Sequence, residues 1–185
     1  MRNADLAAVI DRRRGLPVAL SVLWLHAGRA AGWSLCGLNF PGHFLLRIDA
    51  AGERLVFDPF NDGRTLGTPE LRELIQSLGG PEAELAPDHT APLSNRGILL
   101  RLQNNIKARL LKQGDAAGAL FVLDGMLILA PGAAALWREA GLLHVQRESL
   151  GSARRCLERA VELAESAATR QRIAAELAAI RSRLH

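Results

Sequence analysis

The chain has 185 residues, which is enough for one domain of ordinary size or for two small ones. Hydrophobic residues make up 49% of it and aromatic residues only 4%, so much of the apolar content is Ala and Leu, a composition that favours helix over sheet. The formal net charge is +4, and the basic residues are scattered along the chain. Because the sequence has no helix-turn-helix, zinc-finger or basic-stripe pattern, nucleic acid is a disfavoured partner.

The two cysteines, Cys36 and Cys156, lie far apart, and neither is part of a Cys-x-x-Cys pair. This spacing argues against a zinc site and against a disulfide framework, so we predict no metal and no cofactor. The N-terminus lacks the apolar core of a signal peptide. The apolar run from Leu16 to Leu25 is interrupted by Pro17 and is too short to span a bilayer. We therefore expect a cytoplasmic protein without a membrane partner.

Two helices are predicted at the start of the chain. Residues 4–13 form a short helix with Asn3 as its N-cap, because Asn accepts hydrogen bonds from the free N–H groups of a first turn. Pro17 suits the first turn of a second helix that ends near Ala31, before Gly32. This second helix is apolar on nearly every side, so we expect it in the interior of a domain.

A strand-rich segment follows the second helix. Phe44, Leu46 and Ile48 alternate with residues of the opposite face, which is the period of a strand. The predicted elements are strands at 34–39, 43–48 and 54–58, a turn at 49–52, a helix at 68–78 and a linker at 79–95. This part of the chain therefore mixes helices with short strands.

The last part of the chain is helical throughout and contains a repeat. Its apolar positions recur 34 residues later, where Ala119, Leu123, Met126 and Leu129 correspond to Ala153, Leu157, Ala160 and Leu163. This is the period of the tetratricopeptide repeat (TPR). Trp137, Gly141 and His144 have the spacing of the repeat's signature, Pro131 fits its terminal proline, and residues 169–184 form a capping helix. Unrelated amphipathic helices are the alternative, because there are fewer than three repeats.

A histidine and an aspartate meet if the turn between two predicted strands is tight. With Ala50 and Ala51 as the central turn residues, His43 stands opposite Asp58, with Cβ atoms roughly 4.5–5.5 Å apart. A carboxylate beside a histidine fixes its tautomer, as in catalytic triads. A bulge or a shifted turn would break this pairing. A structural hydrogen bond, or a histidine that only packs, is the alternative interpretation.

Several motifs carry a resemblance to a known family. They are RRRGLPVALS at 12–21, GLNFPGHF at 37–44, DPFN at 58–61 and NNIK at 104–107. In these motifs the chain resembles the bacterial transglutaminase-like plus TPR family labelled "regulator of SirC expression", a SirB-type protein. The resemblance implies an α+β fold, in which a transglutaminase/papain-like module with a central helix on a small antiparallel sheet precedes an all-α TPR-like array. The expected domains are 1–90 and 91–185.

The resemblance also implies a catalytic layout. In the superfamily the nucleophile is a cysteine at the start of the central helix, and the histidine and aspartate lie on adjacent strands. His43 and Asp58 match the last two positions. The position of the cysteine is occupied by Leu16–Pro17, and neither residue has a nucleophilic atom. Ser21, one turn later, and Cys36, on a predicted strand, are the remaining candidates.

Both substitute nucleophiles have a more common structural role. A buried helical serine such as Ser21 usually hydrogen-bonds to the backbone of its own helix, and Cys36 has the size and polarity of a small core residue. The motif residues expected to contribute to binding are Arg14, Pro17, Asn39, Gly42 and Asn61.

The favoured function is that of a non-catalytic binding or regulatory protein, a pseudoenzyme whose TPR-like helices bind a protein or peptide partner. A hydrolase or acyl transferase, with His43 as base and Asp58 as its orienting group, is the alternative. Nucleic-acid binding driven by arginine ranks last. The start of the chain resembles a segment that lies well inside the family's proteins. We therefore expect an N-terminally shortened chain with exposed apolar surface, and homo-oligomerisation as a consequence.

Overall fold

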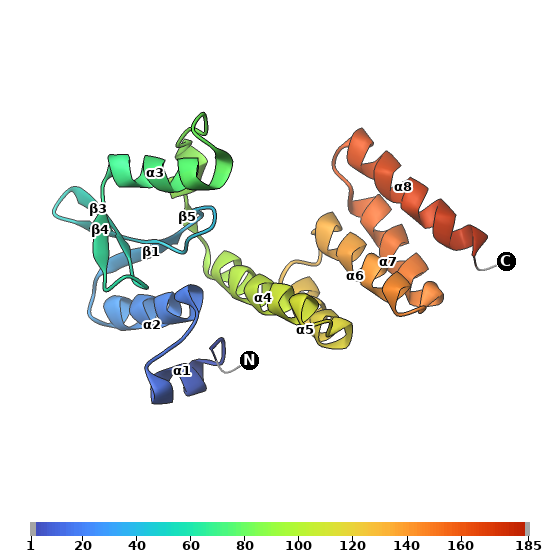
Figure 1. Ribbon diagram of the computed structural model, residues 1–185, viewed down its shortest axis with the longest axis horizontal. Helices are drawn as coiled ribbons and strands as arrows, with labels where there is room; N and C mark the ends of the chain where they lie inside the picture. The colour runs from blue at the N-terminus through green and yellow to red at the C-terminus, as the bar shows by residue number, and fades with distance from the viewer. Residues whose placement is uncertain (1–2, 184–185) are drawn as a thin grey trace. The chain divides into compact units, whose positions relative to one another are not determined.

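The computed structural model describes residues 3–183 of the chain (Figure 1). These residues form two compact units that meet between Leu102 and Gln103. The first unit combines helices with a five-stranded sheet, and the described part of the second unit is helical. The predicted α+β class, with a helical repeat region after the sheet, is confirmed. Among the described residues, no helix is both long enough and apolar enough to cross a membrane.

The first unit begins with two helices, α1 (Leu6–Arg12) and α2 (Pro17–Ala30). Asp5 caps α1, because its Oδ1 accepts hydrogen bonds from two N–H groups of the first turn, at 3.1 and 3.4 Å. The predicted cap, Asn3, is wrong: its side-chain oxygen instead accepts a hydrogen bond from Arg12 at 3.0 Å. The helix starts later than predicted because Asp5, two residues further on, caps its first turn.

The sheet is antiparallel, with strand order β4-β3-β2-β1-β5. Its strands are β1 (Ser34–Leu38), β2 (Leu46–Ala50), β3 (Glu53–Asp58), β4 (Arg64–Leu66) and β5 (Pro92–Leu93). The first three overlap the predicted strands. β4 and β5 were not predicted, because two or three residues are too few to show a period.

The turn between β2 and β3 lies one residue later than predicted. Ala51 and Gly52 are its central residues, with φ angles of 51° and 85°. Two successive left-handed residues define a type I′ turn, whose twist matches that of the flanking strands. Ala50, predicted as a turn residue, is the last residue of β2 and pairs with Glu53.

This shift changes which residues stand opposite each other at the open end of the hairpin. Leu46 pairs with Phe57, so the next residue, Asp58, lies level with Leu45. The predicted direct pairing of His43 with Asp58 is therefore wrong. His43 lies two positions further along, before β2 begins.

Two helices cover opposite faces of the sheet, α2 on one side and α3 (Thr68–Gly79) on the other (Figure 1). On the α2 side, Trp24 packs edge-to-face against Phe57 of β3, with ring centroids 5.5 Å apart. On the α3 side lies a buried cluster that consists of Leu38, Phe40, Leu45, Leu71 and Ile75. Between α3 and β5 the chain forms a loop with one 3₁₀ turn, Pro87–Thr90.

The remaining helices carry the repeat. α4 (Asn95–Lys112) begins in the first unit and ends in the second. It is followed by α5 (Ala116–Leu129), α6 (Ala134–Gln146), α7 (Leu150–Leu163) and α8 (Ala167–Ser182). α8 corresponds to the predicted capping helix, whose last predicted residue, Leu184, lies outside the described residues.

Six of the eight predicted repeat positions are buried in the second unit, and Leu129 and Leu163 are half-buried. The buried repeat residues are Ala119, Leu123 and Met126 in α5, and Ala153, Leu157 and Ala160 in α7. Gly141 of α6 also has the predicted role, because a Cβ atom there would lie 2.8 Å from Leu157 Cγ and 3.3 Å from the carbonyl oxygen of Ala153. The absence of a side chain at Gly141 thus allows α6 and α7 to approach closely.

Candidate functional site

Three segments of the first unit converge at one end of the sheet. β1 runs back along α2, because only residues 31–33 connect them, so the end of β1 lies near the start of α2 (Figure 1). Leu38, the last residue of β1, donates a backbone hydrogen bond to Leu45 at 2.9 Å. Leu45 lies level with Asp58 at the end of β3. The start of α2, the loop 39–45 and the turn after β3 therefore share one end of the unit.

Asp58 builds the turn that follows β3. It is buried, its Oδ1 accepts a hydrogen bond from the N–H of Phe60 at 2.8 Å, and its Oδ2 accepts one from Asn61 Nδ2 at 2.6 Å. Phe57 faces α2 and strand residues alternate, so Asp58 belongs to the α3 side of the sheet. Both carboxylate oxygens are thus engaged by the Asp-Pro-Phe-Asn motif itself.

His43 lies in the loop that precedes β2. Its backbone N–H donates to the carbonyl of Pro41 at 2.7 Å, and its half-buried ring lies edge-to-face to Phe40, with centroids 6.4 Å apart. Among the hydrogen bonds of residues 3–183, none joins His43 to Asp58. The two residues reach the same end of the sheet but do not form the hydrogen-bonded pair of a triad.

The start of α2 carries no nucleophile that points outwards. Pro17 is its first residue, and Leu16, in an extended conformation, precedes it without a side-chain hydrogen bond to the first turn. Ser21 is fully buried, and its hydroxyl donates to the carbonyl oxygen of Pro17 at 2.8 Å. This is the intrahelical bond that a buried serine commonly makes, and it keeps the hydroxyl within its own helix.

Cys36 lies in the middle of β1, opposite Arg47 of β2, and its side chain is half-buried. Burial raises the pKa of its thiol. The positive charges of Arg47 and Arg29 lower this pKa, and the negative charge of Asp49 raises it further. Reactive cysteines instead have a lowered pKa, so Cys36 resembles a core residue more than a nucleophile.

Arg101 of α4 holds the loop that carries His43. Its Nη2 donates to the carbonyl oxygens of Phe40 and His43, the latter at 2.6 Å, and its guanidinium lies 5.4 Å from the centroid of the Phe44 ring. Burial lowers the pKa of Arg101, and the two carbonyls and the aromatic face offset the cost of its charge. No motif singles out Arg101, because an arginine within a helical pattern does not reveal what it contacts.

The other predicted binding residues differ in exposure. Arg14 and Asn39 are exposed, and the backbone N–H of Asn39 donates to Ala91 at 2.9 Å. Gly42 has a φ of 68°, and a Cβ atom there would lie 2.8 Å from Leu78 Cδ1. A side chain at Gly42 would therefore be strained and would clash with Leu78 of α3. This glycine thus allows the loop to take its conformation.

Two family models match the chain. The model described as the transglutaminase-like superfamily matches residues 1–104, and a tetratricopeptide repeat model matches residues 106–178. The chain belongs to the transglutaminase-like superfamily. The predicted combination of a transglutaminase-like part with TPR helices is thereby confirmed.

Relatives of the same kind occur in several bacteria. A UPF0162 protein of Xylella fastidiosa (strain 9a5c) is 35% identical over 88% of this chain, which corresponds to 59% of the relative. A UPF0162 protein of Pseudomonas aeruginosa is 34% identical over 95% of the chain and 64% of the relative. Protein SirB1 of Salmonella typhimurium is 28% identical over 77% of the chain and 53% of the relative. The chain thus spans little more than half the length of these relatives.

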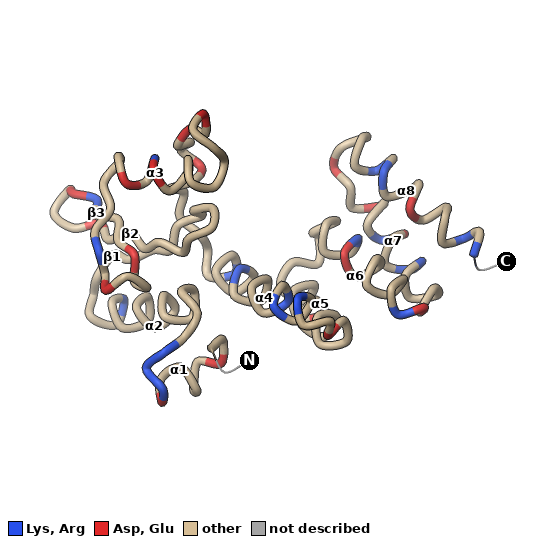
Figure 2. Tube along the Cα trace, viewed as in Figure 1, with Lys and Arg blue, Asp and Glu red and all other residues tan. Residues whose placement is uncertain are grey.

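The helices of the TPR part carry both basic and acidic residues (Figure 2), and two ion pairs join alternate helices. Lys107 of α4, which is nearly buried, pairs with Glu139 of α6, and Arg138 of α6 pairs in a two-pronged manner with Glu176 of α8. The hydrogen bond from Glu176 raises the pKa of Arg138. α4, α6 and α8 are the first helices of successive repeat units, and stacked repeats present such helices as an extended binding surface. The two ion pairs thus link the first helices of successive repeat units.

Proposed function

We propose that this chain is a non-catalytic binding and regulatory protein, a pseudoenzyme that has the superfamily's fold without its nucleophile. The observation that carries this proposal is Pro17 at the first position of α2, where the family resemblance implies a cysteine. Proline has no group that can attack a carbonyl carbon. The hydroxyl of Ser21 is buried and already donates to Pro17, so it does not replace the missing thiol.

The recognition surface in this proposal is the end of the sheet where the motifs converge. Asn39 and Asn61 are exposed there, and His43 is partly exposed. Amide side chains both donate and accept hydrogen bonds, as a peptide group does, which favours a peptide ligand. Asp58 fixes the turn that presents Asn61, and Arg14 precedes the start of α2 with an exposed positive charge.

The TPR helices supply the second part of the proposal. Stacked repeats are surfaces for binding extended segments of other proteins, and the two ion pairs join α4 to α6 and α6 to α8, the helices that would form such a surface. We place this function in the cytoplasm, where the free Cys36 and Cys156 would stay reduced.

A hydrolase or acyl transferase is the second candidate. It is favoured by one observation, that His43 and Asp58 lie at the same end of the sheet as the start of α2. Such an enzyme would need Cys36 or Ser21 as nucleophile. It would also need a rearrangement that frees Asp58 from the Asn61 turn.

Covalent probes distinguish the two candidates. The protein is incubated with iodoacetamide and, separately, with a fluorophosphonate, and adducts are counted by intact-mass spectrometry. The proposal predicts the same labelling in the wild type, in His43→Ala and in the matched loop variant Asn39→Ala. Stoichiometric labelling that is lost only in His43→Ala would establish the enzyme instead.

A further inference from the structure

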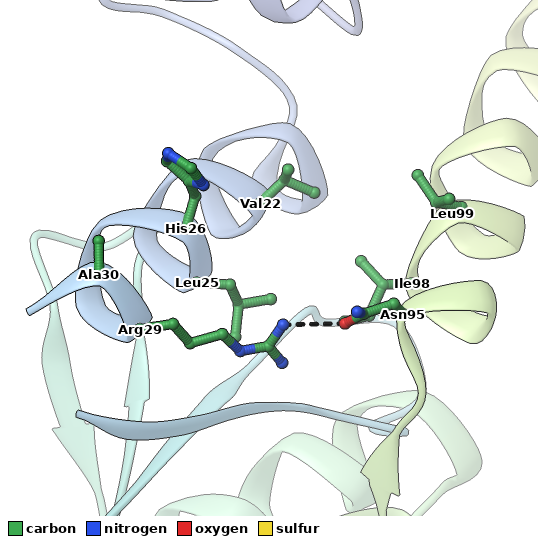
Figure 3. Close-up of a pocket in the computed structure, with 8 residues that line it drawn as sticks. All are labelled: Val22, Leu25, His26, Arg29, Ala30, Asn95, Ile98 and Leu99. Atoms are coloured by element: carbon green, nitrogen blue, oxygen red, sulfur yellow. Dashed lines mark hydrogen bonds between the residues drawn. The ribbon is translucent and has the colours of Figure 1, made fainter. Parts of the chain in front are cut away.

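A pocket of about 530 Å³ lies in the first unit between α2 and the first turns of α4 (Figure 3). Its volume is within the range of small-molecule sites, roughly 300–1,000 Å³. The apolar part of its wall consists of Val22, Leu25, Ala30, Ile98 and Leu99. Leu25 and Ile98 are buried, whereas Leu99 is 42% exposed. A large apolar side chain that faces an open pocket is a surface on which an apolar ligand group can be buried.

One side of the pocket is polar and positively charged. Arg29 of α2 reaches across it, and its Nη1 donates to Asn95 Oδ1 at 2.9 Å (Figure 3). The same guanidinium donates through Nε to the carbonyl of Leu35 at 3.2 Å. These two bonds hold the flexible side chain in one orientation, so less rotamer entropy is lost when a ligand binds.

The charge of this guanidinium is not balanced within the pocket. None of the residues that line it is an aspartate or a glutamate, and His26 is its other ionisable side chain. Among the hydrogen bonds of residues 3–183, those of Arg29 use Nε and Nη1, which leaves Nη2 without a partner there. A fixed guanidinium with a spare donor is the group that proteins commonly use to bind a carboxylate.

We propose that this pocket binds a small carboxylate ligand with an apolar tail. The carboxylate accepts hydrogen bonds from Arg29, and the tail lies along Val22, Leu25 and Leu99, away from water. Charge complementarity selects the anion, and the apolar wall selects the tail. The pocket uses α2 from Val22 onwards, whereas the surface proposed above lies at the start of that helix. This inference therefore stands independently of the proposed function.

Octanoate is a suitable probe, used with the full chain at submicellar concentration. Isothermal titration gives the affinity, and amide chemical-shift changes in ¹H–¹⁵N spectra locate the site. We expect shift changes around Arg29 and Leu99. We also expect binding at least about tenfold tighter than that of 1-octanol, which has the same tail without the charge. Equal binding of the alcohol, or shift changes elsewhere, would overturn the proposal.

Two variants separate recognition from folding. Arg29→Gln removes the positive charge and should weaken octanoate binding about tenfold or more. Leu99→Glu places a carboxylate at the pocket without touching the bonds of Arg29, and should abolish binding with little effect on thermal unfolding. Leu111→Glu, also on α4 but outside the pocket, is the matched control and should bind like the wild type. Undiminished binding by Leu99→Glu would contradict the assignment.

Discussion

At the scale of single residues, the hairpin between β2 and β3 shows how far sequence reasoning reaches. The alternation of Phe44, Leu46 and Ile48 predicted the first of the two strands, and the turn signal after it predicted that the chain returns as a second strand. The turn was predicted one residue too early, although the glycine at position 52 indicates where the turn lies. A type I′ turn needs two left-handed residues, and glycine is favoured at the second of them. This rule selects Ala51–Gly52 as the central residues of the turn. With that turn, His43 no longer stands opposite Asp58.

The structure also assigns Asp58 a role that its spacing alone did not predict. Its carboxylate bridges the N–H of Phe60 and the amide of Asn61, and is buried while doing so. These hydrogen bonds depend on the conformation of the turn after β3. Pairing residues across two strands, as in the sequence-based prediction, gives no information about that turn. Asp58 is therefore first of all a residue that shapes the end of the sheet.

This role predicts a clear loss of stability. Asp58→Ala should lower the free energy of unfolding by about 2–4 kcal/mol, because two hydrogen bonds to a carboxylate are lost and a backbone N–H is left unsatisfied. Asp58→Asn, which keeps one acceptor, should lose roughly half as much. Equilibrium unfolding in urea measures both.

Asp11→Ala, at an exposed position of α1, is the control for this comparison and should change stability by less than about 0.5 kcal/mol. If Asp58→Ala unfolds at the same urea concentration as the control, then the turn does not depend on this carboxylate. The role assigned to Asp58 would then be wrong.

At the scale of elements, the loop 39–45 depends on a contact from another helix. The loop contains Pro41 and Gly42, and Arg101 of α4 binds two of its carbonyl oxygens. No local pattern could have revealed this contact, because the partners are about sixty residues apart in the chain. The loop that carries His43 is thus ordered by a long-range, charge-assisted contact.

Replacing Arg101 should loosen this loop. In Arg101→Met, the carbonyls of Phe40 and His43 lose a charged donor, and the local opening free energy should fall by about 1–3 kcal/mol. Hydrogen exchange followed by mass spectrometry would show faster exchange in peptides that cover the loop. Arg109→Met, at an exposed position of the same helix, should leave that exchange unchanged. Equal protection in both variants would show that Arg101 does not order the loop.

In contrast, the close contact between α6 and α7 could be predicted from the repeat signature in the sequence. Gly141 should not tolerate a methyl group, because the added Cβ would meet Leu157 and the backbone of α7. We expect Gly141→Ala to lower the free energy of unfolding by about 1–2 kcal/mol, after allowance for the gain in helix propensity.

Gly125 of α5 provides a matched control, because a Cβ atom there would have no neighbour within 4 Å. Gly125→Ala should therefore raise stability by about 0.5–1 kcal/mol through helix propensity alone. Thermal or chemical denaturation of the two variants tests the pair. Stabilisation by both substitutions would mean that α6 and α7 do not pack as closely as described.

At the scale of the whole molecule, the fold class and the repeat were predictable because both rest on local periods. The helical repeat was visible in residues 34 positions apart, and the α+β part in its short alternating runs. The pocket beside Arg29 was not predictable, because it arises from the packing of α2 against α4, far apart in the sequence. The proline at the start of α2 was evident from the motif itself, whereas the hydrogen bond of the Ser21 hydroxyl to Pro17 became visible only in the structure.

We propose that His43 activates no nucleophile among residues 3–183. The most direct measurement is the alkylation rate of Cys36 by iodoacetamide as a function of pH, in a Cys156→Ala background. Because burial raises the pKa of this thiol, its reactive thiolate should accumulate only at alkaline pH. We predict slow alkylation at neutral pH that is the same with and without His43→Ala. Rapid alkylation at mildly acidic pH that disappears in His43→Ala would contradict the claim.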